Sequence, residues 1–176
     1  MFKRELIFLF LFFGNIFAFD LSKISTFQAN FTQIINSDNK ELIYRGEIFA
    51  KKEPNNVRWN YIYPLEKQVF IFAKKTILIE PELEQVTIRN LDQEIPFFDI
   101  LNKAEQIDNN HYVALLNDYK FFLVLKNNQI SRIFYKDSFD NDVSIKLSDV
   151  KINSPFDKNI FTVEFSEDFD VINDSQ

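Results

Sequence analysis

This 176-residue sequence has few of the histidine and cysteine side chains that most often act as nucleophiles, bases or metal ligands. The chain has one histidine, His111, and no cysteine, so it has no thiol nucleophile, no disulfide and no thiolate metal site. A zinc site needs several ligands at suitable spacing, and His111 stands alone. A hydrolase would require His111 to meet a carboxylate in a cleft, and no Ser or Cys motif accompanies it. We therefore expect no enzymatic activity, no metal and no cofactor.

Two groups of carboxylates are the remaining candidates for chemistry. Glu80, Glu82 and Glu84 alternate along the chain, and three aspartates cluster within residues 137–142. Glycosidases place two carboxylates across a cleft, whereas rows of this kind are typical of solvated edges and turns. Residues 137–142 are too few for a calcium loop and lack its central glycine. With two glycines in all, the chain has no glycine-rich phosphate loop.

The N-terminus has the pattern of a secretory signal peptide. Lys3 and Arg4 precede an apolar run over residues 6–13, and the small residue Ala18 marks a cleavage point. The alternative is a membrane anchor, but the run is shorter than the ~20 residues that a span needs. We predict a signal peptide at 1–18 and a single domain at 19–176. That domain has eighteen basic and twenty-five acidic residues, which argues against nucleic acid as a partner.

The segment NVRWNYIY (56–63) predicts a strand with one oily face. Successive strand side chains alternate, so Val57, Trp59 and Tyr61 share a face and Arg58 lies on the other. The chain has 22 phenylalanines, and residues 67–81 and 120–127 are apolar on both faces. Such strands either form plain core or border an apolar cavity, and the excess of aromatic residues favours an apolar ligand. From its position alone, Arg58 is either a surface cation or an anchor for a segment outside the sheet.

Hydrophobic periodicity predicts the elements that carry this face. Helical spacing predicts helices over 20–36 and 92–106, the second beginning near Pro96. Two asparagines at 127–128 predict a tight hairpin. Strands are predicted at 41–52, 56–63, 66–73, 75–81, 84–90, 111–117, 120–127, 129–136, 142–150 and 159–165. An antiparallel sheet of this size curls or closes, and the helices would cover its mouth.

Four segments resemble, in the same order, motifs of the LolA family, the periplasmic carriers of outer-membrane lipoproteins. The segments are FQANFTQ (27–33), PNNVRWNYIYP (54–64), EPELEQVTIR (80–89) and IPFFDIL (95–101). They span roughly residues 27–101, and the C-terminal third matches only in the rhythm of its strands.

The resemblance implies a mainly β fold: an unclosed antiparallel barrel of about eleven strands with a helical lid over an apolar cavity. It implies a soluble, monomeric periplasmic protein that binds the acyl chains of lipoproteins. Its partners would be an inner-membrane ABC release complex and an outer-membrane receptor or equivalent acceptor. That receptor is itself a lipoprotein and needs an N-terminal cysteine, so this chain resembles the carrier. The alternatives are a periplasmic lipoprotein sensor of the same fold and a β-adaptor without a cavity.

The resemblance also implies roles for particular residues. Arg58 would anchor the wall from outside. Glu53 stands where the family commonly has a basic residue that meets the lid, so either Lys52 takes over this anchoring or the latch differs. The residues implied for the acyl-chain cavity are Val57, Trp59, Tyr61, Ile24, Phe27, Phe31, Phe97 and Leu101.

Overall fold

The computed structural model describes residues 19–37, 40–90, 97–157 and 159–174, so the predicted signal peptide lies outside the described residues. A 3₁₀ turn, η1 (Leu21–Lys23), precedes the first strand, a second one, η2 (Pro81–Leu83), follows β5, and a short helix, α1 (Phe97–Asn102), follows β6. The strands are β1 (Thr26–Ser37), β2 (Lys40–Lys51), β3 (Asn56–Tyr63), β4 (Lys67–Phe72), β5 (Lys75–Glu80), β6 (Gln85–Asn90), β7 (Glu105–Gln106), β8 (His111–Leu116), β9 (Tyr119–Lys126), β10 (Gln129–Lys136), β11 (Asp142–Ile152) and β12 (Asp170–Asp174).

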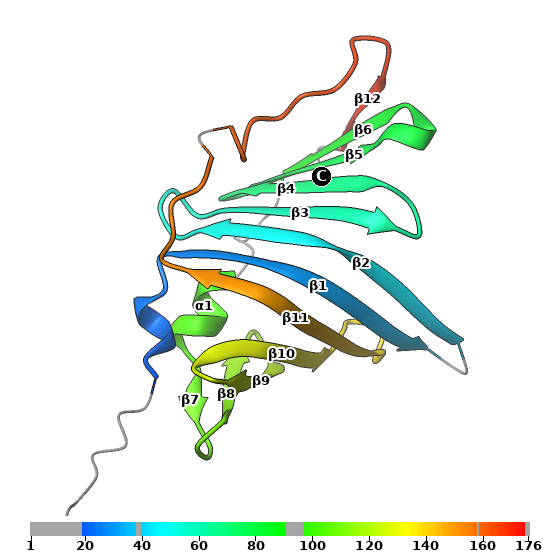
Figure 1. Ribbon diagram of the computed structural model, residues 1–176. Coiled ribbons are helices and arrows are strands. Elements are labelled where there is room, and N and C mark those ends of the chain that lie inside the picture. The colour runs from blue at the N-terminus through cyan, green and yellow to red at the C-terminus, as the bar shows by residue number, and fades with distance from the viewer. Residues whose placement is uncertain (1–18, 38–39, 91–96, 158, 175–176) are drawn as a thin grey trace, which may run out of the picture.

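These strands form a single sheet in the order β12-β6-β5-β4-β3-β2-β1-β11-β10-β9-β8-β7. Neighbours are antiparallel except for β12, which pairs parallel to β6. The sheet is curved with α1 on its concave side, and its end strands β12 and β7 lie far apart (Figure 1). The predicted unclosed antiparallel sheet is therefore confirmed, with twelve strands where about eleven were expected.

The predicted helix over 20–36 is wrong, because most of this segment is strand β1. Residues 27, 29 and 31 are buried in alternation, and β1 is hydrogen-bonded to β2 on one side and β11 on the other. A spacing of four puts two residues on the same face of a helix and also on the same face of a strand. The apolar series Phe27, Phe31 and Ile35 therefore fits both periods, and pairing on both edges decides for the strand.

Two further predictions differ from the structure in extent. The helix expected over 92–106 is reduced to α1, residues 91–96 with Pro96 lie outside the described residues, and Glu105–Gln106 is strand β7. Residues 159–165 contain turns and no strand, and the last strand is β12. The hairpin at Asn127–Asn128 is confirmed, since both residues have positive φ between β9 and β10.

The two faces of the sheet carry separate apolar clusters. The concave cluster joins β1, β2 and β3 to β8–β11 and to the two short helical elements η1 and α1. The convex cluster is built on Phe70, Ile79 and Val86 and is covered by the chain between β11 and β12. We call this covering segment the C-terminal strap (residues 153–157 and 159–169). It contributes Val163 and Phe169 to the convex cluster, so the wall of the hollow is packed on both sides.

Candidate functional site

His111 lies at the start of β8 and pairs with a carboxylate on the turn before it. Its Nδ1 is 2.7 Å from Oδ1 of Asp108, and the two side chains are 52% and 59% exposed. The backbone N–H of Asn110 and then the His111 ring lower the pKa of the Asp108 carboxyl by hydrogen bonding. The pair therefore stabilises an exposed turn. Among the described residues, no group of three or more His, Cys, Asp or Glu side chains could hold a metal ion.

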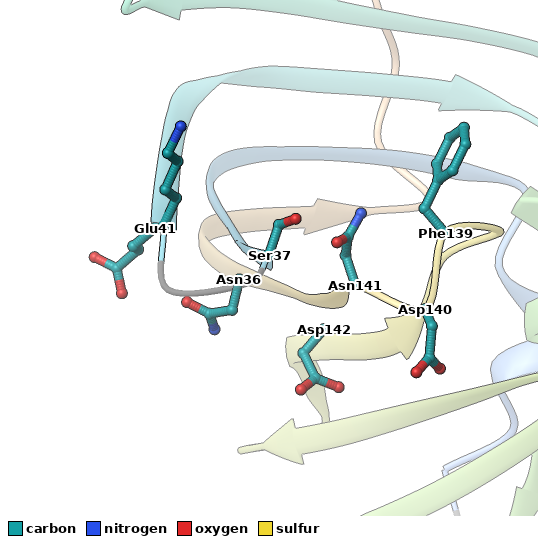
Figure 2. Close-up of a pocket in the computed structure, with 8 residues that line it drawn as sticks. Asn36, Ser37, Glu41, Phe139, Asp140, Asn141 and Asp142 are labelled. Carbon is teal, nitrogen blue, oxygen red and sulfur yellow. The ribbon is translucent and has the colours of Figure 1, made fainter.

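The end of the sheet where β1 meets β2 holds a polar hollow of about 760 Å³. Figure 2 shows its lining from the end of β1, the start of β2 and the turn between β10 and β11. Asn36, Glu41, Asp140 and Asp142 give it a polar, mostly acidic character. Acyl chains would bury little apolar surface here, so the hollow is not suited to a lipid.

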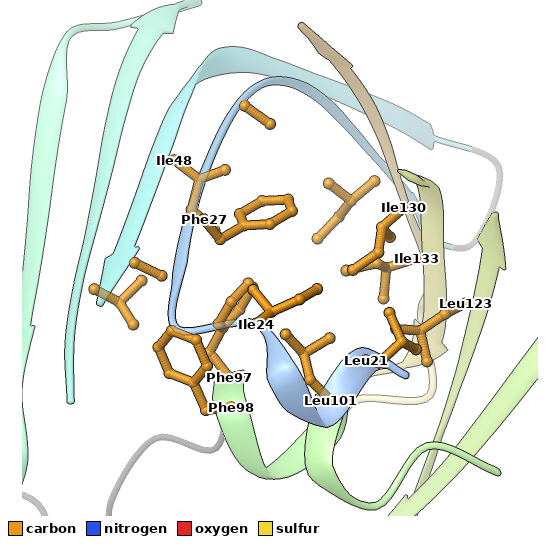
Figure 3. Close-up of a cluster of buried hydrophobic side chains, with 14 of the residues drawn as sticks. Leu21, Ile24, Phe27, Ile48, Phe97, Phe98, Leu101, Leu123, Ile130 and Ile133 are labelled. Atoms are coloured by element: carbon orange, nitrogen blue, oxygen red, sulfur yellow. The ribbon is translucent and has the colours of Figure 1, made fainter. Parts of the chain in front are cut away.

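An apolar cavity of about 380 Å³ lies between the concave face of the sheet and α1. Its volume falls within the range of roughly 300–1,000 Å³ typical of ligand sites. Figure 3 shows side chains of η1 and α1 reaching into the same hollow as those of the strands. The cavity is lined by Phe27, Gln33, Ile48, Val57, Trp59, Tyr61, Val69, Ile71, Phe97, Ile100, Phe121, Ile133, Tyr135, Ile145 and Leu147.

Strand register places the aromatic residues of β3 in this cavity. Trp59 is opposite Ile48 on β2 and Val69 on β4, and all three side chains line the cavity. The ring of Phe31 on β1 packs against two of the aromatic residues of β3, with its centroid 5.0 Å from that of Trp59 and 5.1 Å from that of Tyr61. Edge-on packing of this kind holds the aromatic wall in a fixed orientation.

The residues named from the sequence divide into lining and support. Phe27, Val57, Trp59, Tyr61 and Phe97 line the cavity. The rings of Phe27 and Phe97 pack directly against each other, with centroids 5.4 Å apart. The other three named residues belong to the buried concave cluster around the cavity and are Ile24, Phe31 and Leu101.

Arg58 lies on the convex side of the same strand and contacts the strap. Its Nη1 donates to the backbone oxygen of Ile160 at 2.9 Å, and its Nη2 donates to Oε1 of Gln68 at 3.0 Å. The guanidinium lies over the Phe70 ring, 5.0 Å from its centroid. Burial lowers the pKa of Arg58, and the Glu47 carboxylate opposes this effect. Of the two readings left open by the sequence, this geometry fits the anchor.

Lys52 connects the two helical elements η1 and α1. Its Nζ donates to the backbone oxygen of Ser22 in η1 at 3.1 Å and to Oδ1 of Asn102 in α1 at 3.0 Å. Glu53, the next residue, is exposed. One ammonium therefore holds both elements over the end of the hollow where Phe97 lies.

Ten of the fifteen lining residues were not identified from the sequence. Ile133 and Tyr135 on β10 and Ile145 and Leu147 on β11 come from the C-terminal third, where the family motifs give no guide. The signal was present as alternation, since these residues occupy every second position of their strands. Gln33 was hidden by the helix predicted for β1.

Comparison with known proteins agrees with this architecture. The sequence profile of the family described as outer membrane lipoprotein carrier protein LolA matches residues 22–114. A Campylobacter jejuni protein named outer-membrane lipoprotein carrier protein is 33% identical over 170 residues, which cover 97% of this chain and 99% of that protein. A Wolinella succinogenes protein of the same name is 30% identical over 162 residues, covering 91% of this chain and 94% of that protein.

Among solved structures, an uncharacterized conserved protein from Thermus thermophilus superimposes with a TM-score of 0.55. It covers 89% of this chain and 94% of its own at 12% sequence identity, so the likeness concerns the fold alone. Within the described ranges, no helix combines the length and the apolar character needed to cross a membrane.

Proposed function

The chain belongs to the LolA family of outer-membrane lipoprotein carriers, and from this premise we propose that its apolar cavity receives the acyl chains of lipoproteins. Its role is that of a periplasmic lipoprotein carrier. The observation that supports this most directly is the cavity itself. It is open to an apolar ligand, walled by Trp59 and its neighbours, and covered by a short helix.

A carrier is needed because acyl chains leave a membrane with difficulty. Transfer to water costs about 0.8 kcal/mol per CH₂, so a chain of roughly fifteen CH₂ groups costs on the order of 12 kcal/mol. A cavity lined by Phe27, Ile48 and Leu147 offers the acyl chain apolar contacts in place of those it had in the membrane, and no covalent bond is broken. The protein therefore acts by binding and release.

We infer the partners from the family. The lipoprotein would come from an inner-membrane ABC release complex and pass to an outer-membrane receptor or an equivalent acceptor. Release then requires that the acceptor offer the acyl chains a more favourable apolar surface. Nothing in the fold or the relatives favours a sensor or an adaptor without a cavity.

The lid in this proposal consists of η1 and α1, and Lys52 is its latch. In this proposal Lys52 takes over the role of the family's basic residue, and its contacts with both elements support this, although Glu53 stands at the motif position itself. Opening requires that these two hydrogen bonds break and that α1 move away from Phe27.

The emission of Trp59, the chain's only tryptophan, tests the proposal. Addition of a diacylated lipopeptide should give a saturable blue shift near one-to-one, because acyl chains displace water beside the indole. The variant Ile100→Glu puts a carboxylate on the cavity face of α1 and should abolish the shift. The matched control Ile62→Glu, at a position 59% exposed, should leave it unchanged. Absence of a shift in the wild type, with no lipopeptide retained in gel filtration, would refute the carrier function.

A further inference from the structure

A row of polar side chains crosses the concave face at the end of the cavity away from α1. It consists of Gln33, Tyr44, Tyr61, Lys67 and Tyr135, which we call the tyrosine belt. We propose that the belt binds the ester carbonyl oxygens of the bound acyl chains, so that the chains lie with their methyl ends toward α1. This inference rests on the carrier function and assigns the orientation of the ligand within the same cavity.

Strand register brings the belt together. Gln33 on β1 is opposite Tyr44 on β2, and Tyr61 on β3 is opposite Lys67 on β4. Tyr135 approaches from β10, two strands beyond β1. Gln33, Tyr61 and Tyr135 also line the apolar cavity, so their polar ends border the space that the ligand occupies.

Contacts within the belt hold the phenol groups at one level. The Tyr61 hydroxyl donates to Oε1 of Gln33 at 3.4 Å, a long hydrogen bond that a better acceptor would displace. The Lys67 ammonium lies 4.5 Å from the Tyr61 ring centroid and 5.1 Å from that of Tyr44. Burial, and to a smaller extent the nearby Tyr135 and Tyr44 phenols, raises the pKa of Tyr61 to about 12. Tyr61 is therefore a protonated donor at any physiological pH.

At the opposite end of the cavity, the lining residues that the structure describes carry no such groups. Phe27, Val57, Ile71 and Phe97 line it there, and Phe97 belongs to α1. An ester-linked acyl chain has hydrogen-bond acceptors at one end and hydrocarbon along the rest. Donors at one end of the cavity and hydrocarbon side chains at the end near α1 would satisfy both parts in one orientation.

The test compares two synthetic lipopeptides with the full mature chain by isothermal titration calorimetry. One carries two palmitoyl chains in ester linkage, and the other carries two hexadecyl chains in ether linkage, without carbonyl oxygens. The wild type should bind the ester roughly tenfold more tightly, as expected when one or two buried hydrogen bonds are gained. The double variant Tyr61→Phe, Tyr135→Phe should reduce this preference to near unity while its affinity for the ether is unchanged.

The control is the pair Tyr63→Phe and Tyr119→Phe, at positions 48% and 40% exposed, which should retain the preference for the ester. Equal binding of ester and ether by the wild type would overturn the belt and leave the carrier function intact. An equal loss for both ligands in the Tyr61, Tyr135 variant would also overturn it, because the phenols would then be structural. Free palmitate binding more tightly than the ester would overturn the assignment to esters. If the wild type bound neither lipopeptide, the carrier function itself would fail.

Discussion

Replacement of Lys52 by methionine should loosen the lid without unfolding the sheet. Methionine keeps most of the length of the side chain but cannot donate to Ser22 or to Asn102, the two acceptors of Lys52. A hydrogen bond from a charged donor contributes about 1.5–3 kcal/mol when buried. Both bonds lie at a solvent-accessible position, so we expect a combined loss of about 1–2 kcal/mol.

The loss should appear as faster opening of α1, by a factor of roughly 5–30. The backbone amide of Lys103 reports on this, because it donates to the oxygen of Asp99 at 2.9 Å, and this bond at the end of α1 should break more often when the helix loses its anchor at Asn102. Native-state hydrogen exchange should show this amide exchanging faster in Lys52→Met, with partial recovery in Lys52→Arg. Exchange in the central strands should not change.

Lys51→Met is the matched control, since Lys51 is the exposed neighbour at the end of β2. It should leave the exchange of the Lys103 amide at the wild-type rate. Unchanged exchange in the Lys52 variant, or equal acceleration in both variants, would refute the reasoning that Lys52 holds the lid.

Two further predictions concern the wall. Gly46→Ala should lower the free energy of unfolding by about 1–3 kcal/mol in urea, because an added Cβ would collide with the backbone carbonyl of Asn60 on β3, and an unchanged midpoint would contradict this. The raised pKa of Tyr61 means that the folded state favours the neutral phenol, so its contribution is intact below pH 10 and is lost as the pH rises toward 12. Stability should therefore fall by up to about 3 kcal/mol over that interval, and the fall should be smaller in Tyr61→Phe.

Much of the wall could be predicted from the sequence because period-two alternation is a local property. The alternation in NVRWNYIY predicts both the strand β3 and the face on which Val57 and Trp59 lie. The hairpin at 127–128 followed from the tolerance of asparagine for positive φ.

The helix prediction failed for residues 26–37 because their apolar spacing fits both the helical and the strand period. The deciding factor is that β2 and β11 pair with this segment on either side. Pairing with β11 is a tertiary contact, which cannot be recognised from the local sequence. The strand predicted at 159–165 failed for a related reason, whereas those predicted over 120–150 are confirmed as β9, β10 and β11. The strap derives its position from Arg58 and from the convex surface of β4–β6, and its own sequence has no regular period.

The apolar character of the site could be predicted from the sequence, but most of the residues that line it could not. An apolar cavity followed from the excess of aromatic residues, but the partners of Trp59 across the hollow come from β10 and β11. The latch depended on whether Lys52 or another residue reached the lid, and only the three-dimensional course of the chain after β2 placed its ammonium between η1 and α1.

The position of β1 in the middle of the sheet has a consequence for how the protein folds. One edge of β1 pairs with β2, the next strand in the chain, but the other pairs with β11, where Phe27 is opposite Ile152. Contacts so distant in sequence form slowly, and an unpaired strand edge readily joins another chain. During folding, this long edge stays available until β11 arrives. The halves of the cavity meet only when β1 pairs with β11, so the chain becomes able to bind acyl chains at the same step in which this edge is covered.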